Sequence, residues 1–316
     1  MKDDMPSITA VMVAYCVLLL GGDDYGRSRI PPNIIAAQVA VLVAANLPFG
    51  TCPWVLCNPV VAKLARCIAA IWYPGFFEGI GFRKLIIECQ VRDFLQQHET
   101  AERKQVVVVA AGYDTLALRL CREYSSSVNF WEVDHPATSR VKRRVWDNNN
   151  NNNSTDCDAK KNDNEQQQQP LLLGSQPSNM EHVMADLTKI RLDTVLKEQP
   201  GYDPSLPTIV IVEGLSMYLT EGQIRGLLFD QVQASVSKGS VVMFDFFGWN
   251  ERRQTVEVGW VVPAMHKYGF TGGAEPWVWG LDPNKMDQFL DDTDWKLMGD
   301  VQSCGFENVA TLELTC

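Results

Sequence analysis

The clearest chemistry in this sequence belongs to a turn of small residues that follows a β-branched run at 105–110 and precedes a helical pattern beginning at Leu116. Small residues let a backbone approach a ligand closely, and the first amides of a helix are free to donate. A GxGxxG turn binds a pyrophosphate, whereas Asp114 would repel a phosphate and suits a cationic amino-acid group. The turn therefore favours S-adenosylmethionine over NAD. Its candidate binding residues are Ala111, Gly112, Asp114 and Thr115.

Two acids end the next predicted strand, which begins at Val128. An acid at this position holds the ribose diol in nucleotide-binding α/β folds. Either Glu132 or Asp134 can take that role, and the sequence does not choose between them. The other acid is then expected to cap the following helix.

Two further strand ends carry candidate residues. Asp186 and Leu187 follow a short strand near 182–184, where a methyltransferase core can bind adenine. Glu213 and Tyr218 follow the apolar run 208–212, and this loop is expected to face the transferable methyl group. A serine-hydrolase elbow, G-x-S-x-G, would need glycine where Tyr218 stands, so that class is disfavoured.

The elements that must position these residues alternate between strand and helix after residue 101. This alternation predicts an α/β fold with a mostly parallel sheet, ending in an antiparallel pair of 309–314 with 295–298. Residues 1–100 have a helical pattern and are expected to form a cap, and 101–316 the core. Residues 147–178 are low-complexity sequence, which predicts a disordered insertion. The aromatic segment 247–285, with Trp277 and Trp279, is either a pocket wall or a filler between cap and sheet.

Composition limits the function classes. A net charge of −10 argues against nucleic acid as the partner. Nine cysteines without a CxxC pair, and four histidines without ligand spacing, predict no metal site. The apolar run 8–20 is too short to span a bilayer, so no stable membrane insertion is expected. We expect a buried first helix capped by Ser7 in a cytoplasmic protein, with a signal peptide as the lesser alternative.

Four motifs in order, QVVVVAAGYDTLALRL, FWEVDHPATSRVKRR, ADL and VEGLSMYLTEGQIRGLL, resemble the leucine carboxyl methyltransferase family, and especially its microbial-type, mostly uncharacterised branch. The resemblance implies a Rossmann-like class I methyltransferase fold with a seven-stranded sheet, an N-terminal helical cap, S-adenosyl-L-methionine as cofactor and no metal. The sequence departs from the family's G-A-G turn at Ala110, and Tyr113 replaces a commoner aliphatic residue or Phe.

Carried over by motif, the resemblance assigns a role to each candidate residue. Gly112, Asp114 and Thr115 would line the methionine part, and Asp134 with Glu132 the ribose. Asp186 and Leu187 would hold the adenine, while Glu213 and Tyr218 lie on the cofactor and acceptor side and are the catalytic candidates. Arg83, in the helix before the first strand, is the best match for the arginine that pairs with the cofactor carboxylate.

Methyl transfer from a sulfonium is an in-line displacement that depends mainly on positioning. A carboxylate acceptor is already ionised at pH 7 and needs no base. A hydroxyl acceptor needs one, and the candidates are Tyr218, His135 and His266. The sequence predicts O-methylation of a small-molecule carboxylate or hydroxyl. The alternatives are a protein methyltransferase acting on the C-terminal leucine carboxylate of a phosphatase catalytic subunit, and a non-catalytic cofactor-binding protein.

Overall fold

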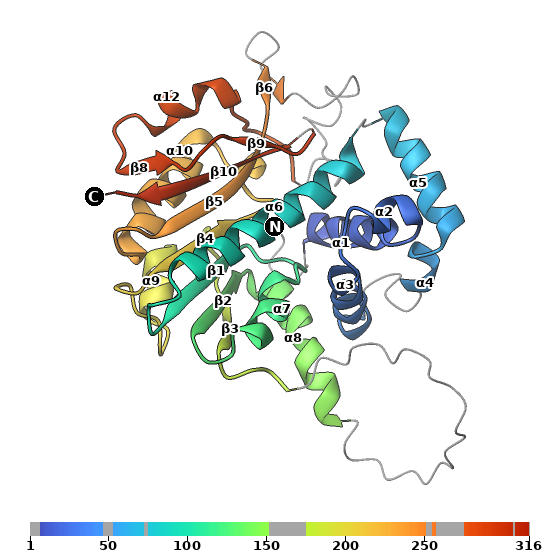
Figure 1. The fold of residues 1–316 in the computed structure, drawn as a ribbon, viewed down its shortest axis with the longest axis horizontal. Helices are drawn as coiled ribbons and strands as arrows, with labels where there is room; N and C mark the ends of the chain where they lie inside the picture. Colours follow the sequence, from blue (N-terminus) through green and yellow to red (C-terminus); the bar gives the residue numbers. More distant parts are fainter. Residues whose placement is uncertain are drawn as a thin grey trace.

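The computed structural model describes residues 7–46, 53–72, 75–151, 175–250, 255–256, 275–305 and 307–315. The chain up to Gln97 contributes helices, as the sequence pattern predicts (Figure 1). These are α1 (Ile8–Leu20), α2 (Asp24–Arg27), α3 (Pro32–Ala44), α4 (Pro53–Leu56), α5 (Pro59–Trp72) and α6 (Phe76–Gln97).

The first helix begins where its capping residue predicts. The Ser7 side chain accepts a hydrogen bond of 3.2 Å from the amide of Ala10, which satisfies one of the donors that a helix start leaves unpaired. The inner face of α1 is buried against α3 and α6. The predicted first helix is therefore confirmed. No helix in the described ranges combines the length and the apolar character needed to cross a bilayer.

The sheet follows the predicted α/β order. Its strands lie side by side as β3-β2-β1-β4-β5-β10-β8; the first five are parallel, and β10 is antiparallel to both β5 and β8. A two-residue strand, β9, also pairs with β10, so the sheet has eight strands where seven were predicted. The bounds are β1 (Lys104–Val109), β2 (Val128–Asp134), β3 (Met180–Met184), β4 (Thr208–Val212), β5 (Val241–Phe247), β8 (Trp295–Leu297), β9 (Gln302–Ser303) and β10 (Glu307–Leu314). A separate short pair joins β6 (Trp249–Asn250) to β7 (Thr255–Val256).

Helices cover both faces of the sheet, which explains why β1 and β4 are continuous runs of buried, mostly apolar residues (Figure 1). One core cluster joins one sheet face to α1, α3, α6, α7 (Leu116–Glu123) and α8 (Pro136–Asn151). The other joins the opposite face to a second set of helical segments. These include α9 (Leu192–Lys197), α10 (Glu221–Arg225), η2 (Gly226–Val232) and α12 (Met286–Leu290); η1 (Ser216–Tyr218), η3 (Gln233–Ser235) and η4 (Pro283–Lys285) are short 3₁₀ turns.

The predicted insertion at 147–178 lies mostly outside the described residues, but its beginning is not irregular. Helix α8 continues to Asn151, which corrects the expected boundary. Beyond the gap, the side-chain amide of Asn179 donates to the carbonyl oxygens of Cys121 and Val128 at 3.0 and 2.9 Å. Strand β3 is therefore fixed to its neighbours immediately before it begins.

The aromatic segment is described only in part. Trp279 is a core residue, with its ring 5.5 Å from that of Phe289, and Trp277 packs 4.5 Å from Phe247. Both indoles are buried, so at these two positions the aromatic residues fill space against the sheet. Trp260, His266, Tyr268 and Phe270 lie outside the described residues.

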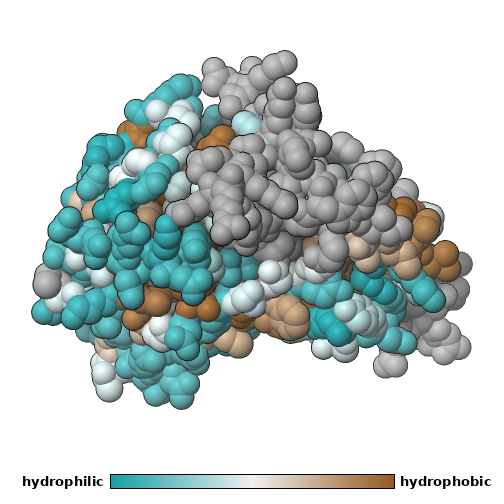
Figure 2. All heavy atoms as spheres, turned by 90° about the horizontal axis from the view of Figure 1, so that it is seen from above, coloured by the Kyte–Doolittle hydropathy of each residue, from teal (hydrophilic) through white to brown (hydrophobic). Residues whose placement is uncertain are grey.

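The surface differs between the two ends of the molecule. Helix α5 exposes three apolar side chains at helical spacing, Val60, Leu64 and Ile68, which are 74%, 59% and 51% accessible. Hydrophobic atoms are visible at that end in Figure 2, whereas hydrophilic atoms dominate over the sheet.

Candidate active site

The small-residue turn after β1 has an unusual backbone. Ala110 and Gly112 both have a positive φ, of 53° and 48°, a region that costs a side chain strain and that glycine enters freely. A Cβ atom on Gly112 would lie 3.1 Å from the Cβ atom of Ala10 in α1. The first turn of α1 therefore packs directly on this turn, and glycine avoids both the strain of the positive φ and a tight contact with Ala10.

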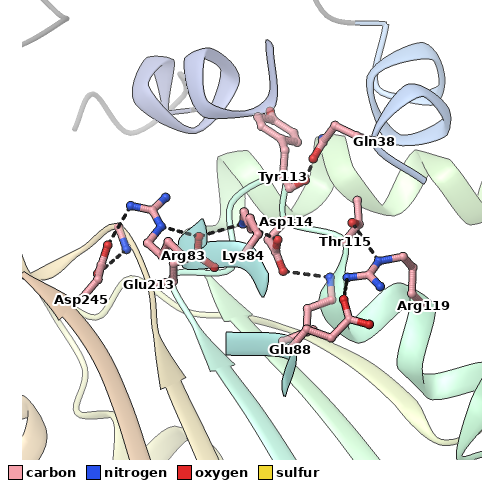
Figure 3. A network of polar contacts seen from close by, with 12 residues as sticks. Gln38, Arg83, Lys84, Glu88, Tyr113, Asp114, Thr115, Arg119, Glu213 and Asp245 are labelled. Atoms are coloured by element: carbon pink, nitrogen blue, oxygen red, sulfur yellow. Dashed lines mark hydrogen bonds and ion pairs between the residues drawn. The ribbon is translucent and has the colours of Figure 1, made fainter. Parts of the chain in front are cut away.

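Arg83 lies at the centre of a buried ion-pair cluster at the carboxyl edge of the sheet. Its guanidinium contacts Glu213 after β4 at 2.9 Å, Asp245 in β5 at 2.8 Å and Glu307 in β10 at 2.7 Å (Figure 3 shows the first two). The Arg83 side chain is only 3% accessible. Helix α6 thus carries one cation to the ends of three strands.

Lys84 extends this cluster to the turn. Its ammonium group contacts Glu213 at 2.8 Å and also pairs with Asp114, so it joins the loop after β4 to the loop after β1 (Figure 3). We call these six residues the edge cluster: Arg83, Lys84, Asp114, Glu213, Asp245 and Glu307. It contains four carboxylates and two cations, and so has a surplus of negative charge when every carboxyl is ionised.

The pKa values in the edge cluster reflect this surplus. Burial, together with the charges of Asp245 and Glu213, raises the pKa of Glu307 to about 7 although Arg83 opposes the rise. Burial also raises the pKa of Asp245. The pKa of Asp114 moves the opposite way: burial would raise it, but the neighbouring charges of Lys84 and Lys142 hold it well below its usual range.

Glu132 and Asp134 have different surroundings although both project from β2. Glu132 is 2% accessible; one of its oxygens is 2.8 Å from the ammonium of Lys142 in α8, and the other is 3.1 Å from Nδ1 of His182 in β3. Asp134 lies at the end of the strand, where its carboxylate accepts hydrogen bonds from the amides of Gly112 and His135. Of the two acids, Asp134 is the one beside the turn.

The two residues after β3 lie further along the same edge. Asp186 pairs with Lys189 at 2.9 Å, and Nε2 of His135 is 3.8 Å from its carboxylate. Leu187 packs against the core on the α9 side. An open hollow of about 470 Å³ lies beside Asp186 and is lined by β3 and α9.

Two other predicted residues have structural partners. Thr115 is buried, and its hydroxyl accepts a hydrogen bond of 3.3 Å from Arg119, which in turn pairs with Glu88 (Figure 3). Ala111 is buried, and its amide donates to the carbonyl of Val133 at 3.4 Å. Ala111 thus holds the turn through its backbone, and Thr115 holds it through its side chain.

A second polar group surrounds Tyr218. The indole Nε1 of Trp277 donates to its hydroxyl at 3.3 Å. The Thr9 hydroxyl donates to the carboxylate of Glu275, and Ser7 contacts the other oxygen of that carboxylate at 3.5 Å. The N-terminus of α1 is thereby held against the segment before η4, which in turn contacts the loop after β4 through Trp277.

Sequence reasoning missed several residues that the structure brings to these sites. Lys84 stands next to Arg83 and offered no signal beyond its charge, while Asp245 lies within β5 and Glu307 begins β10, two residues before the predicted strand 309–314. An acid inside an apolar strand such as 241–247 was the one available indication, because a buried charge needs a partner. The missed residues are Thr9, Lys84, Asp245, Glu275 and Glu307.

Comparisons with known proteins agree with this fold. A crystal structure of a protein from Thermobifida fusca YX, provisionally named a methyltransferase, superimposes with a TM-score of 0.51 at 14% identity, covering 90% of this chain and 98% of that one. The architecture is that of a class I methyltransferase. The sequence pattern of the leucine carboxyl methyltransferase family matches residues 68–232, which is more than half of the chain. The chain belongs to this family.

Two relatives come from mycobacteria, and both are provisionally named S-adenosyl-L-methionine-dependent methyltransferases. The protein of Mycobacterium tuberculosis (strain ATCC 25618 / H37Rv) is 32% identical over 143 residues, 45% of this chain and 33% of the relative. The protein of Mycobacterium avium (strain 104) is 26% identical over 227 residues, 68% of this chain and 64% of the relative. The match thus spans about a third of the length of the first relative.

Proposed function

We propose that this protein is an S-adenosyl-L-methionine-dependent methyltransferase that methylates an oxygen atom, a hydroxyl or a carboxylate, of a small molecule. The observation that carries the proposal is the edge cluster, in which four carboxylates face two cations beside a glycine turn. The names of the mycobacterial relatives support the same cofactor.

The residues present fit this cofactor. S-adenosylmethionine carries an ammonium, a sulfonium and one carboxylate, so its net charge complements an acidic edge. Asp114 and Glu213 already hold one ammonium, that of Lys84, between them. In this proposal they hold the cofactor's ammonium as well, and Arg83 attracts its carboxylate.

The remaining assignments follow the order of the strand ends. Asp134, beside Gly112, would accept from the ribose hydroxyls, and Asp186 with Leu187 would contact the adenine. Glu132 already faces Lys142 and His182, so we assign it a structural role. Ala111, Gly112 and Thr115 would shape the turn against the methionine part.

The bound cofactor supplies an electrophilic methyl group, and the protein supplies the geometry. Fixing two reactants in line contributes on the order of 7–11 kcal/mol to such a reaction. The first turn of α1 packs on the turn at Gly112. A small-molecule acceptor would enter beside Tyr218.

The proposal is tested by titrating the purified protein with S-adenosylmethionine in a calorimeter. We expect saturable binding of one cofactor molecule, and absence of binding would refute the proposal. The family description supports a second acceptor, a protein C-terminal carboxylate. A peptide that ends in leucine, offered with radiolabelled cofactor, separates the two, because only the protein-directed enzyme would form a base-labile methyl ester on it.

A further inference from the structure

Helix α5 has small side chains on its inner face and large apolar ones on its outer face. Ala62 is completely buried, and Ala65 packs against a core cluster that includes residues of α1, α3 and α6. The exposed row of Val60, Leu64 and Ile68 lies on the outer face. Burial of large apolar side chains stabilises a fold more than burial of small ones, so the folding of a single chain does not explain this arrangement.

Two further exposed side chains accompany this row. Trp54 is 70% accessible and belongs to α4, which packs against α5. Lys63 is exposed on α5, one position before Leu64. Both helices lie at the end of the molecule away from the sheet (Figure 1). We call these five residues the outer patch: Trp54, Val60, Lys63, Leu64 and Ile68.

The stretch of sequence that contains the outer patch is cationic, although the protein is acidic. Residues 25–77 contain four lysines and arginines and neither Asp nor Glu, whereas the whole chain has 38 acids. Two of the acids that flank this stretch are already partnered: Asp23 accepts from Arg66 at 2.7 Å, and Glu78 accepts from Tyr25 at 2.7 Å. The outer patch therefore combines apolar surface with positive charge, and it suits an anionic partner.

We propose that the outer patch docks on an anionic phospholipid membrane, with α5 lying parallel to the membrane surface. An apolar helix face that is bordered by a tryptophan and a lysine is typical of helices that insert about 5–10 Å, as far as the boundary between headgroups and acyl chains. The stem of Lys63 can lie along the apolar surface while its ammonium reaches the lipid phosphates. This inference does not depend on the proposed catalytic activity.

The length of α5 agrees with a helix that lies on a membrane. Its 14 residues span about 21 Å, whereas the hydrocarbon core of a bilayer is about 30 Å thick. Along this length the large apolar side chains form a single row on the outer face. Shallow insertion needs no more than such a row.

A second copy of this chain is the competing occupant, and it fits the outer patch less well. A two-fold contact would place each patch against itself and so bring the two Lys63 side chains towards each other. A stable protein interface takes about 800 Å², or about 20–30 residues, from each partner. The outer patch offers five residues, which is enough for a membrane but not for a stable dimer.

The first experiment is flotation of the full-length protein with vesicles of phosphatidylcholine, alone or in an equimolar mixture with phosphatidylglycerol. We expect binding to the anionic vesicles that weakens as salt is added. Leu64→Gln should weaken it about tenfold, because an apolar side chain no longer enters the lipid, and Lys63→Gln about fivefold. Ile190→Gln, which alters an aliphatic side chain that is 38% accessible outside the patch, is the matched control. No binding, equal binding to both vesicles, or full binding by Leu64→Gln would overturn the proposal.

Urea unfolding and analytical ultracentrifugation of the same variants separate lost docking from other effects. Because Leu64 is exposed, Leu64→Gln should have the urea midpoint of the unchanged protein. A dimer that forms without vesicles and that Leu64→Gln dissociates would show that α5 is a contact between copies. That result would overturn the membrane proposal.

The second experiment needs no substitution. Cys67 on α5 and Cys89 on α6 are both exposed thiols. A water-soluble maleimide modifies both, and mass spectrometry of peptides measures the two rates. We expect the anionic vesicles to slow the modification of Cys67 and to leave that of Cys89 unchanged. A rate at Cys67 that the vesicles do not change would mean that no membrane covers α5, and it would overturn the proposal.

Discussion

Within the described residues, the buried charges around Glu132 and those of the edge cluster differ in balance. Next to α8, Glu132 faces Lys142 one to one at 2.8 Å. The indole of Trp146 donates to Nε2 of His182 at 2.8 Å, and Nδ1 of the same ring lies 3.1 Å from Glu132. In the edge cluster, four carboxylates share two cations. Both groups are almost completely buried, so access to water does not distinguish them.

The comparison teaches how to separate a structural acid from a candidate ligand-binding acid. Buried charges are tolerated when each has a partner of opposite charge. Glu132 and Lys142 are such a pair and need no further ligand. The edge cluster has more carboxylates than cations, and a cationic ligand would balance its charge. Glu132 and Asp134, two positions apart on one strand, thus fall on opposite sides of this distinction.

The largest effect is expected from removing the central cation of the edge cluster. Arg83→Ala leaves Glu213, Asp245 and Glu307 facing one another, and loss of one partner from a buried ion pair costs about 3–5 kcal/mol. Urea unfolding measures this loss. Arg92→Ala is the control, since its side chain is 35% accessible and an exposed pair contributes at most about 1 kcal/mol. Equal losses in the two variants would refute the central role of Arg83.

The two acids of β2 should respond in opposite ways. Glu132→Gln leaves Lys142 unpaired and should lower the free energy of unfolding by about 3 kcal/mol, with cofactor affinity of the folded protein unchanged. Asp134→Ala should weaken S-adenosylmethionine binding at least about tenfold, equivalent to 1.4 kcal/mol, with a smaller loss of stability. Calorimetry and urea unfolding on both variants test the pair. Unchanged affinity in Asp134→Ala would contradict the ribose assignment.

The two groups should also respond oppositely to pH. Folding raises the pKa of Glu307 from 4.5 to about 7, so the folded state holds that proton more tightly. The contribution of Glu307 to the free energy of unfolding is therefore complete below pH 4.5 and is lost as the pH rises through 7. The pKa of Glu132 is lowered in the folded state, so its contribution is present above 4.5 and is lost on acidification.

Urea midpoints between pH 5 and pH 8 test the Glu307 part of this prediction. Each pKa unit corresponds to about 1.4 kcal/mol, and we expect a decline on the order of 2 kcal/mol that Glu307→Gln removes. Glu313→Gln, on the same strand, should leave the decline in place. If Glu307→Gln has the same pH profile as the unchanged protein, then the excess negative charge of the edge cluster does not raise the pKa of Glu307.

The smallest effect concerns the turn itself. Ala110 has a φ of 53°, which costs a non-glycine residue about 1–2 kcal/mol, and glycine recovers most of this after its own entropy cost. Ala110→Gly should therefore stabilise the protein by about 0.5–1 kcal/mol. Thermal unfolding detects the change. The neighbouring Ala111→Gly should destabilise, because Ala111 does not have a positive φ.

Much of the fold could be predicted because its signals are local. The β-branched runs at β1 and β4, the cap at Ser7 and the small-residue turn each depend on a few adjacent residues. The order of these signals also predicted the parallel sheet and the antiparallel pairing of β8 with β10. The end of α8 was placed too early, because low-complexity composition does not show where a helix stops.

By itself, the sequence determined which residue types stand at the strand ends and therefore the class of ligand that the site suits. Only the tertiary structure decided which acids are already paired. The guanidinium of Arg83 meets Glu307 across 224 positions, and Thr9 meets Glu275 across 266. A carboxylate's role depends on the charges within a few ångströms of it, and here those charges come from strands and helices that only folding brings together.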